Sequence, residues 1–173
     1  ADKGWEFYQP PLYYFVSAVW AKAGIILGMS EGAAVLSVQR LSVLLSIGTL
    51  ALSAVMCMMA FPKKPWLQAM ALMLPAFLPG LVMQASRVNN DVGLLFLSTC
   101  TILCLFGWWK THRTWWWLCT AGFTGLAVLT KSNALALLVP VGLCLLWQRS
   151  AWTTKIIQGV RAAAVFVLLL ERL

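Results

Sequence analysis

Long apolar runs separated by short polar turns make up most of the chain. A helix that crosses the hydrocarbon core of a bilayer needs about 20 mostly apolar residues. The runs predict six transmembrane helices, at residues 41–61, 66–86, 92–109, 115–130, 134–147 and 156–170. We therefore expect an all-α fold, a polytopic membrane helix bundle that forms a single membrane domain over residues 1–173.

A shorter apolar helix is expected before these runs, at residues 10–27. Pro10 and Pro11 suit the first turn of a helix, where a missing N–H group costs nothing. Lys22 lies in the middle of the segment, which favours a juxtamembrane helix lying at the membrane interface over a complete span. Ser30 follows in a turn and is a candidate N-cap for the next helix.

Two of the predicted spans have unusual features. Pro75 and the pair Pro79-Gly80 predict a kink within residues 66–86. The run at residues 115–130 is roughly 24 Å long as a helix, less than the hydrocarbon thickness of about 30 Å. Its Lys131 end is therefore expected in a thinned or water-filled recess of the membrane.

The turns between the runs fall into two chemically different groups. One group, at residues 63–64, 110–113 and 149–155, is basic and lies among most of the tryptophans, which is typical of a cytoplasmic headgroup layer. The opposite face receives all five acidic residues together with Arg40, residues 87–91 and Lys131. The polar residues that need a chemical explanation are therefore expected on the outer face.

Composition excludes an ordinary soluble domain, because 61% of the residues are apolar and only 10% are charged. The net charge of +8 suits contact with anionic membrane lipids, whereas the scattered basic residues do not support a nucleic-acid partner. The five cysteines lie in apolar runs and are expected to be small core residues. Cys100 and Cys104 share a helix face, but no histidine or acid lies near them to complete a metal site.

The polar cluster at residues 87–91 carries the main candidate chemistry. The spacing of Arg87 and Asp91 would place both charges on one helix face, one turn apart, where they can pair. Cations bind phosphate through charge-assisted hydrogen bonds, and a carboxylate can take a proton from a hydroxyl or hold a divalent ion. The alternative is a simple polar turn that caps two membrane helices.

The other polar residues on this face also have structural alternatives. Tyr13 and Tyr14 suit a sugar pocket, but they also suit an aromatic belt at the headgroup level. Arg40 can extend its side chain to the interface, and Lys131 can anchor a helix end. The functional interpretation depends on all of them gathering on one face.

The order of four motifs resembles the membrane core of the GT-C superfamily of polyprenyl-phosphate-dependent glycosyltransferases, which includes protein O-mannosyltransferases and the aminoarabinose transferases of lipid A. The motifs are QPPLYY at residues 9–14, RLS at 40–42, SRVNND at 86–91 and GLAVLTK at 125–131. The resemblance implies transfer of a sugar from a polyprenyl-phosphate donor to an acceptor hydroxyl on the outer face. It also implies an integral membrane protein of the bacterial inner (plasma) membrane.

The resemblance assigns roles to individual residues. Asp91 matches the acidic residue of the second outer loop, which in some members contributes to a metal site, and we expect it to be the catalytic residue here and the ligand of a divalent metal ion, if one is used. The resemblance implies that the substrate is bound by Arg87, Asn90, Lys131, Arg40, Gln9, Tyr13 and Tyr14.

The chain also departs from the family pattern. Family members usually carry an acidic motif, thought to supply the catalytic base, upstream of the segment that matches residues 9–14. Here Asp2 and Glu6 are the candidates, and neither lies in the expected pattern. The alternative is therefore a shortened, non-catalytic relative that packs among other subunits of a larger membrane complex.

Overall fold

The computed structural model describes residues 10, 12–85, 87–148 and 152–171, and all regular elements in this part of the chain are helices. They are α1 (Leu12–Ile26), α2 (Glu31–Ala60), α3 (Pro65–Ala76), α4 (Pro79–Ala85), α5 (Asn90–Thr111), α6 (Thr114–Thr130), the 3₁₀ helix η2 (Ser132–Leu137), α7 (Leu138–Trp147) and α8 (Trp152–Glu171). The expected all-α fold is confirmed.

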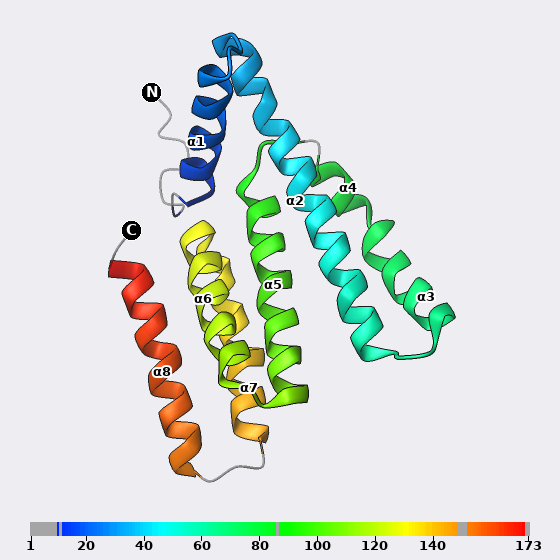
Figure 1. The fold of residues 1–173 in the computed structure, drawn as a ribbon, viewed down its shortest axis with the longest axis vertical. Coiled ribbons are helices and arrows are strands. Elements are labelled where there is room, and N and C mark those ends of the chain that lie inside the picture. The colour runs from blue at the N-terminus through cyan, green and yellow to red at the C-terminus, as the bar shows by residue number, and fades with distance from the viewer. Residues whose placement is uncertain (1–9, 11, 86, 149–151, 172–173) are drawn as a thin grey trace.

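The antiparallel pair α5 and α6 forms the centre of the bundle (Figure 1). Helix α8 packs against α6 on one side, and α2 packs against α5 on the other. Helix α1 runs along the N-terminal half of α2, and the bent pair α3–α4 returns along the other side of α2. The C-terminal ends of α2, α5 and α7 lie at one end of the bundle, and the start of α5 and the end of α6 lie toward the other (Figure 1).

Helix α2 begins ten residues before the predicted start at residue 41. Ser30 is its N-cap, as expected, and the Ser30 hydroxyl accepts a 3.4 Å hydrogen bond from the amide of Ala33. Arg40 has an exposed side chain and does not interrupt the helix. At 30 residues the helix is roughly 45 Å long and exceeds the hydrocarbon thickness, so a charge near one end can stay in the interface.

The predicted kink in residues 66–86 is confirmed as a complete break. Helices α3 and α4 meet at an angle of 60°. Pro75 lies inside the last turn of α3, and Pro79 begins α4, where its fixed backbone angle suits a first turn. A break of this kind is tolerated in a bundle because neighbouring groups satisfy the freed backbone atoms.

The remaining predicted boundaries are close to the observed ones, with two corrections. The expected helix at residues 134–147 starts as the 3₁₀ segment η2 and becomes α-helical only at Leu138. The expected helix at residues 156–170 begins earlier, at Trp152. The expected interfacial helix at residues 10–27 is α1, and Trp20 ties it to α2 by a 3.1 Å hydrogen bond to the carbonyl of Ser37.

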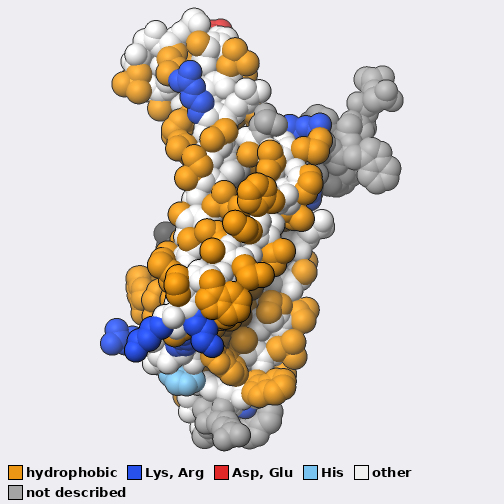
Figure 2. Space-filling view, turned by 90° about the vertical axis from the view of Figure 1, so that its right-hand side faces the viewer, with side chains coloured by type: hydrophobic (Ala, Val, Ile, Leu, Met, Phe, Trp, Pro, Cys, Tyr) orange, Lys and Arg blue, Asp and Glu red, His pale blue; other side chains and the backbone are white. Residues whose placement is uncertain are grey.

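The surface of the bundle is apolar, as required for a chain that lies in lipid. Two helices of the described residues, α2 and α5, are long and apolar enough to cross a membrane, and the bent pair α3–α4 makes a third if it is one span. The count of six spans stays a prediction. Large apolar side chains such as Leu74, Phe77 and Trp147 are about three-quarters exposed, and Figure 2 shows apolar side chains over the middle of one face.

Aromatic packing joins α5, α6 and α8 in the half of the bundle nearer the C-terminal ends of α2, α5 and α7. Trp108 and Trp117 are fully buried with their ring centroids 4.6 Å apart. The indole N–H of Trp117 donates a 2.8 Å hydrogen bond to the carbonyl of Gln158 on α8. Gly107 allows Trp116 to approach α5, because a Cβ atom there would lie 2.8 Å from the Trp116 ring.

We expect Gly107→Ala to destabilise the chain by about 1–3 kcal/mol, because the added methyl group forces Trp116 out of its contact. Gly122→Ala is the matched control in α6, where no other group lies within 4 Å of the added carbon. Thermal unfolding in detergent, followed by circular dichroism, measures both. Equal midpoints for the two variants would show that the contact between Trp116 and Gly107 does not limit stability.

Candidate functional site

Asp91 lies in the first turn of α5, where the position of its carboxylate is fixed by Asn89. The Asn89 side chain accepts a 3.2 Å hydrogen bond from the amide of Asp91 and donates a 3.0 Å hydrogen bond to Oδ2 of the same residue. A negative charge at this position is also stabilised by the partial positive charge of the helix N-terminus. Asp91 is therefore held in place by its own helix start.

Lys131 lies at the C-terminal end of a helix, directly after α6. Its amide donates a 3.0 Å hydrogen bond to the carbonyl of Ala127, and its backbone then turns from helical to extended. The ammonium group donates to Oδ1 of Asp91 over 2.5 Å, and the two side chains are 23% and 28% exposed. Each charge thus has the sign that its helix end favours, and the ion pair joins the start of α5 to the end of α6.

Tyr13 of α1 is buried beside this ion pair. Its ring is 3% exposed, and its hydroxyl forms a 2.9 Å hydrogen bond with the hydroxyl of Ser42 on α2. A Cβ atom at position 93 of α5 would lie 2.9 Å from the Tyr13 ring and 3.3 Å from the methyl group of Thr130 on α6, so only glycine fits there. Four helices therefore meet at Tyr13, and together with Asn89, Asp91 and Lys131 these residues form the candidate site.

The structure brings together four of the residues that the sequence predicted. Asp91, Lys131 and Tyr13 belong to the site, and Asn90, next to Asp91, is 2% exposed. Tyr14 lies at its edge, with its ring 5.8 Å from that of Tyr13 in an edge-to-face arrangement and 41% of its surface exposed.

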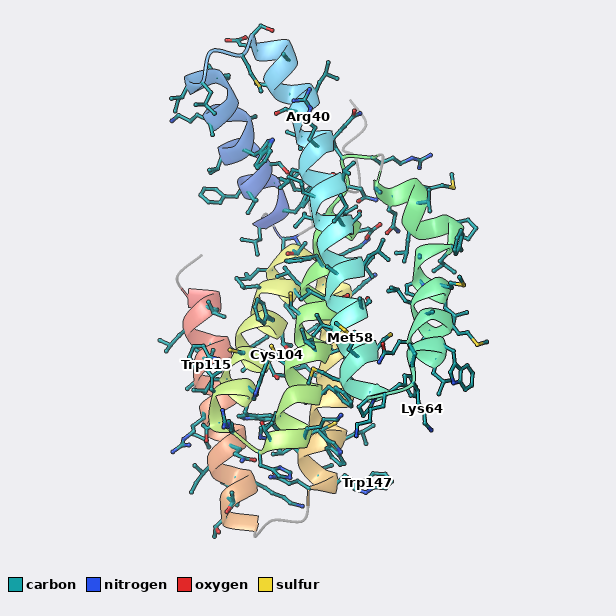
Figure 3. The ribbon with its side chains drawn as sticks, turned by 45° about the vertical axis from the view of Figure 1, so that its right-hand side comes forward. Arg40, Met58, Lys64, Cys104, Trp115 and Trp147 are labelled. Atoms are coloured by element: carbon teal, nitrogen blue, oxygen red, sulfur yellow. The ribbon has the colours of Figure 1, made fainter. Side chains whose placement is uncertain are left out.

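The other predicted residues are not part of the ion pair between Asp91 and Lys131. Arg87 is exposed and precedes the first residue of α5, so the predicted pairing of Arg87 with Asp91 along one helix face is wrong. Asn89 caps α5 in an extended conformation, so the helix does not reach back to Arg87 and the two charges do not share a helix face. The partner of Asp91 is Lys131. Arg40 lies on the upper part of α2 in Figure 3 and lines a separate cavity of about 160 Å³ against α1. Gln9 lies outside the described residues.

Four site residues were missing from the predicted set: Asn89, Ser42, Gly93 and Thr130. Asn89 had a local signal, because an asparagine just before a helical run is a typical N-cap. Ser42 and Thr130 lie in the RLS and GLAVLTK motifs, but their contacts with Tyr13 and Gly93 depend on how α1, α2, α5 and α6 pack.

The described donor set does not fit a divalent metal ion at Asp91. Both carboxylate oxygens already accept hydrogen bonds, one of them from an ammonium group that a cation would have to displace. Within the described ranges, no three His, Cys, Asp or Glu side chains gather to hold a metal. The metal site stays a prediction.

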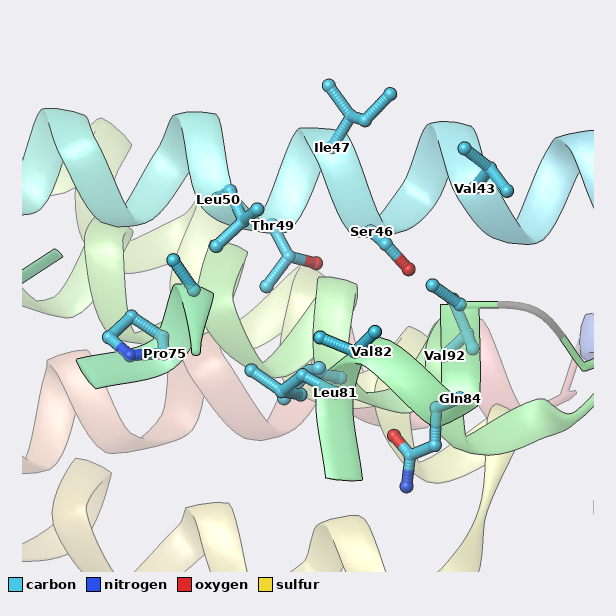
Figure 4. Close-up of a pocket in the computed structure, with 13 residues that line it drawn as sticks. Val43, Ser46, Ile47, Thr49, Leu50, Pro75, Leu81, Val82, Gln84 and Val92 are labelled. Atoms are coloured by element: carbon cyan, nitrogen blue, oxygen red, sulfur yellow. The ribbon is translucent and has the colours of Figure 1, made fainter. Parts of the chain in front are cut away.

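An apolar groove begins next to the site, at Val92. It is bounded by α2, α4 and α5 and by Pro75 of α3, and it has a volume of about 220 Å³ (Figure 4). Ser46 and Thr49 face it from α2, but their hydroxyls donate to carbonyls of their own helix, so the groove is chemically apolar. The groove thus offers an apolar chain a place within reach of a charged pair.

The fold and the site define an integral membrane protein whose helix ends hold a paired acid and base beside an apolar groove. The chain belongs to the dolichyl-phosphate-mannose-protein mannosyltransferase family, whose sequence model matches residues 8–171. This is a family of membrane glycosyltransferases that use lipid-linked sugars, in agreement with the GT-C resemblance. Comparisons with curated proteins and with solved structures give no significant match.

We expect Asp91→Asn and Lys131→Met to be coupled by about 1 kcal/mol in a double-mutant cycle of unfolding free energies, because each removes the partner of the other. The control cycle uses Glu31→Gln and Arg40→Gln, which lie nine residues apart on α2 and should be additive. Denaturant unfolding in detergent measures both cycles. Additive effects at Asp91 and Lys131 would contradict an energetically significant ion pair.

Proposed function

We propose that this chain is the membrane core of a glycosyltransferase that takes a sugar from a polyprenyl-phosphate donor and transfers it to an acceptor hydroxyl. The reaction takes place at the Asp91–Lys131 site, which we assign to the outer face of the bacterial inner membrane. The ion pair is the single observation that carries the proposal, because it places a base and a phosphate-binding cation together at the mouth of an apolar groove.

The site has the groups needed to bind the donor. An ammonium group has three donor positions, and Lys131 uses one of them on Asp91, which leaves two for phosphate oxygens. Arg87 is exposed in the turn just before Asp91 and adds a second cation. The groove next to Val92 takes the first part of the polyprenyl chain, since its lining is almost entirely apolar.

The reaction is a single inverting displacement. The acceptor oxygen attacks the anomeric carbon, its proton passes to the Asp91 carboxylate, and the bond from that carbon to the phosphate oxygen breaks. The electron pair leaves with the polyprenyl phosphate, whose charge Lys131 and Arg87 stabilise. A carboxylate offers about four acceptor positions, so Asp91 keeps positions for a hydroxyl while it is bound to Asn89 and Lys131.

A second candidate function is that of a non-catalytic subunit within a larger membrane complex. The observation in its favour is that both oxygens of Asp91 already have intramolecular partners, which suits a structural link between α5 and α6. In that case the ion pair matters for stability and not for transfer.

We expect Asp91→Asn to lower sugar transfer by about 10²–10⁴-fold, because an amide cannot accept the acceptor proton. Glu31→Gln is the matched control, since Glu31 also occupies the first turn of a capped helix but lies on α2. The measurement is transfer of radiolabelled mannose from polyprenyl-phosphate mannose in membranes that contain the protein. Transfer at the unmodified rate in Asp91→Asn would remove Asp91 from the reaction.

Donor binding separates the two candidate functions. We expect Lys131→Met to weaken binding of unlabelled polyprenyl phosphate, while Asp91→Asn retains it, because the Lys131 ammonium group contacts the phosphate and the Asp91 carboxylate does not. If the chain is a non-catalytic subunit, the unmodified protein should bind polyprenyl phosphate no more tightly than the Lys131→Met variant or the Asp91→Asn variant.

A further inference from the structure

The end of the bundle opposite the candidate site carries a concentrated positive charge. Lys63 and Lys64 lie in the turn between α2 and α3, and Lys110 and Arg113 lie at the turn between α5 and α6; all four side chains are exposed. We call these four residues the basic end. Figure 2 shows Lys and Arg side chains gathered there, close to the histidine. Within the described ranges, the charged carboxylates of Glu31 and Asp91 lie away from it.

The turn that carries the two lysines has an unusual backbone conformation. Lys63 has φ of 64°, in the left-handed region that residues other than glycine and asparagine seldom adopt. The turn lies between two prolines and is closed by hydrogen bonds to the carbonyl of Phe61 from the Lys64 amide, at 3.2 Å, and from the Gln68 side chain, at 2.9 Å. The sequence thus keeps a lysine where glycine or asparagine would be less strained, which points to a use for the side chain.

Lys110 connects the two turns of the basic end. Its ammonium group donates a hydrogen bond to the carbonyl of Met59 in the last turn of α2, and it lies 4.9 Å from the centre of the Phe106 ring. This contact holds the end of α5 against the end of α2. Lys63 and Lys64 lie in the turn that follows this end of α2. Neither of these two side chains has a hydrogen bond or ion pair to any residue that the structure describes.

Exposed indole rings surround the basic end. Trp66, Trp109 and Trp115 are 61%, 40% and 71% exposed and follow or precede its charged residues by at most two positions. Indole rings favour the headgroup level of a bilayer, where one edge is apolar and the other wet. The surrounding tryptophans therefore place the four cations at the depth of lipid phosphates.

We propose that the basic end binds the headgroups of anionic phospholipids, with the Lys63–Lys64 turn as the main contact. The occupant follows from charge complementarity: unpaired cations at headgroup depth attract anionic lipid, and zwitterionic lipid offers no net charge in return. The inference is independent of the proposed glycosyltransferase activity, because none of these residues belongs to the Asp91–Lys131 site.

The test uses the tryptophans as reporters. The full chain is placed in phosphatidylcholine vesicles that contain increasing amounts of phosphatidylglycerol with brominated acyl chains, which quench nearby indole fluorescence. Brominated phosphatidylcholine is the reference. We expect brominated phosphatidylglycerol to quench the tryptophans more strongly than brominated phosphatidylcholine, and we call this difference the excess quenching. Added salt should decrease the excess quenching, because salt screens exposed charges.

Two variants assign the effect to the turn. Lys63→Asn removes the charge and keeps a residue that tolerates the left-handed conformation, and Lys64→Gln removes the second charge. We expect about a five-fold loss of apparent affinity for phosphatidylglycerol with each charge removed. Lys22→Gln, an exposed lysine on α1 away from the basic end, is the matched control and should have no effect.

Three results would overturn the proposal. The first is equal quenching by the two brominated lipids in the unmodified chain. The second is an unchanged excess in the Lys63→Asn, Lys64→Gln double variant while circular dichroism shows it to be folded. The third is loss of the excess when inorganic phosphate replaces chloride at constant ionic strength, which would indicate a site for free phosphate.

Discussion

The ion pair between Asp91 and Lys131 is the interaction on which the arrangement of this end of the bundle depends. It joins the N-terminus of α5 to the C-terminus of α6, so each charge is also favoured by the dipole of its own helix. Both side chains keep about a quarter of their surface exposed, which limits the cost of removing them from water. The ion pair is therefore still accessible from outside the bundle, as a binding site requires.

The packing around the pair makes the site a meeting point of four helices. Tyr13 reaches it only because α1 runs along α2, where the hydroxyl of Ser42 accepts or donates its hydrogen bond, and because Gly93 has no side chain. The apolar groove that starts at Val92 also depends on packing, since its lining comes from α2, α5 and both sides of the break between α3 and α4. The ion pair, the Tyr13 ring and the apolar groove thus all owe their positions to the way these helices pack.

The two ends of the bundle differ in how they use charge. At the candidate site, opposite charges are paired across helices, and the positive side chains are few. At the basic end, Lys63, Lys64 and Arg113 lie beside exposed tryptophans and are available to a partner outside the chain. This asymmetry agrees with a protein that reacts with a lipid-linked substrate at one surface and contacts ordinary membrane lipid at the other.

The sequence by itself determined the helical fold, a kink at Pro75 and Pro79 and the positions of Asp91 and Lys131 at helix ends, because these follow from local periodicity, proline geometry and charge. Only the tertiary structure decided that Asp91 pairs with Lys131 and not with Arg87. Lys131 is 40 residues away from Asp91 in the sequence. Asn89 caps α5, so the helix that would have brought Arg87 next to Asp91 does not include Arg87. Contacts between distant segments depend on how helices pack, which no local pattern of residues contains.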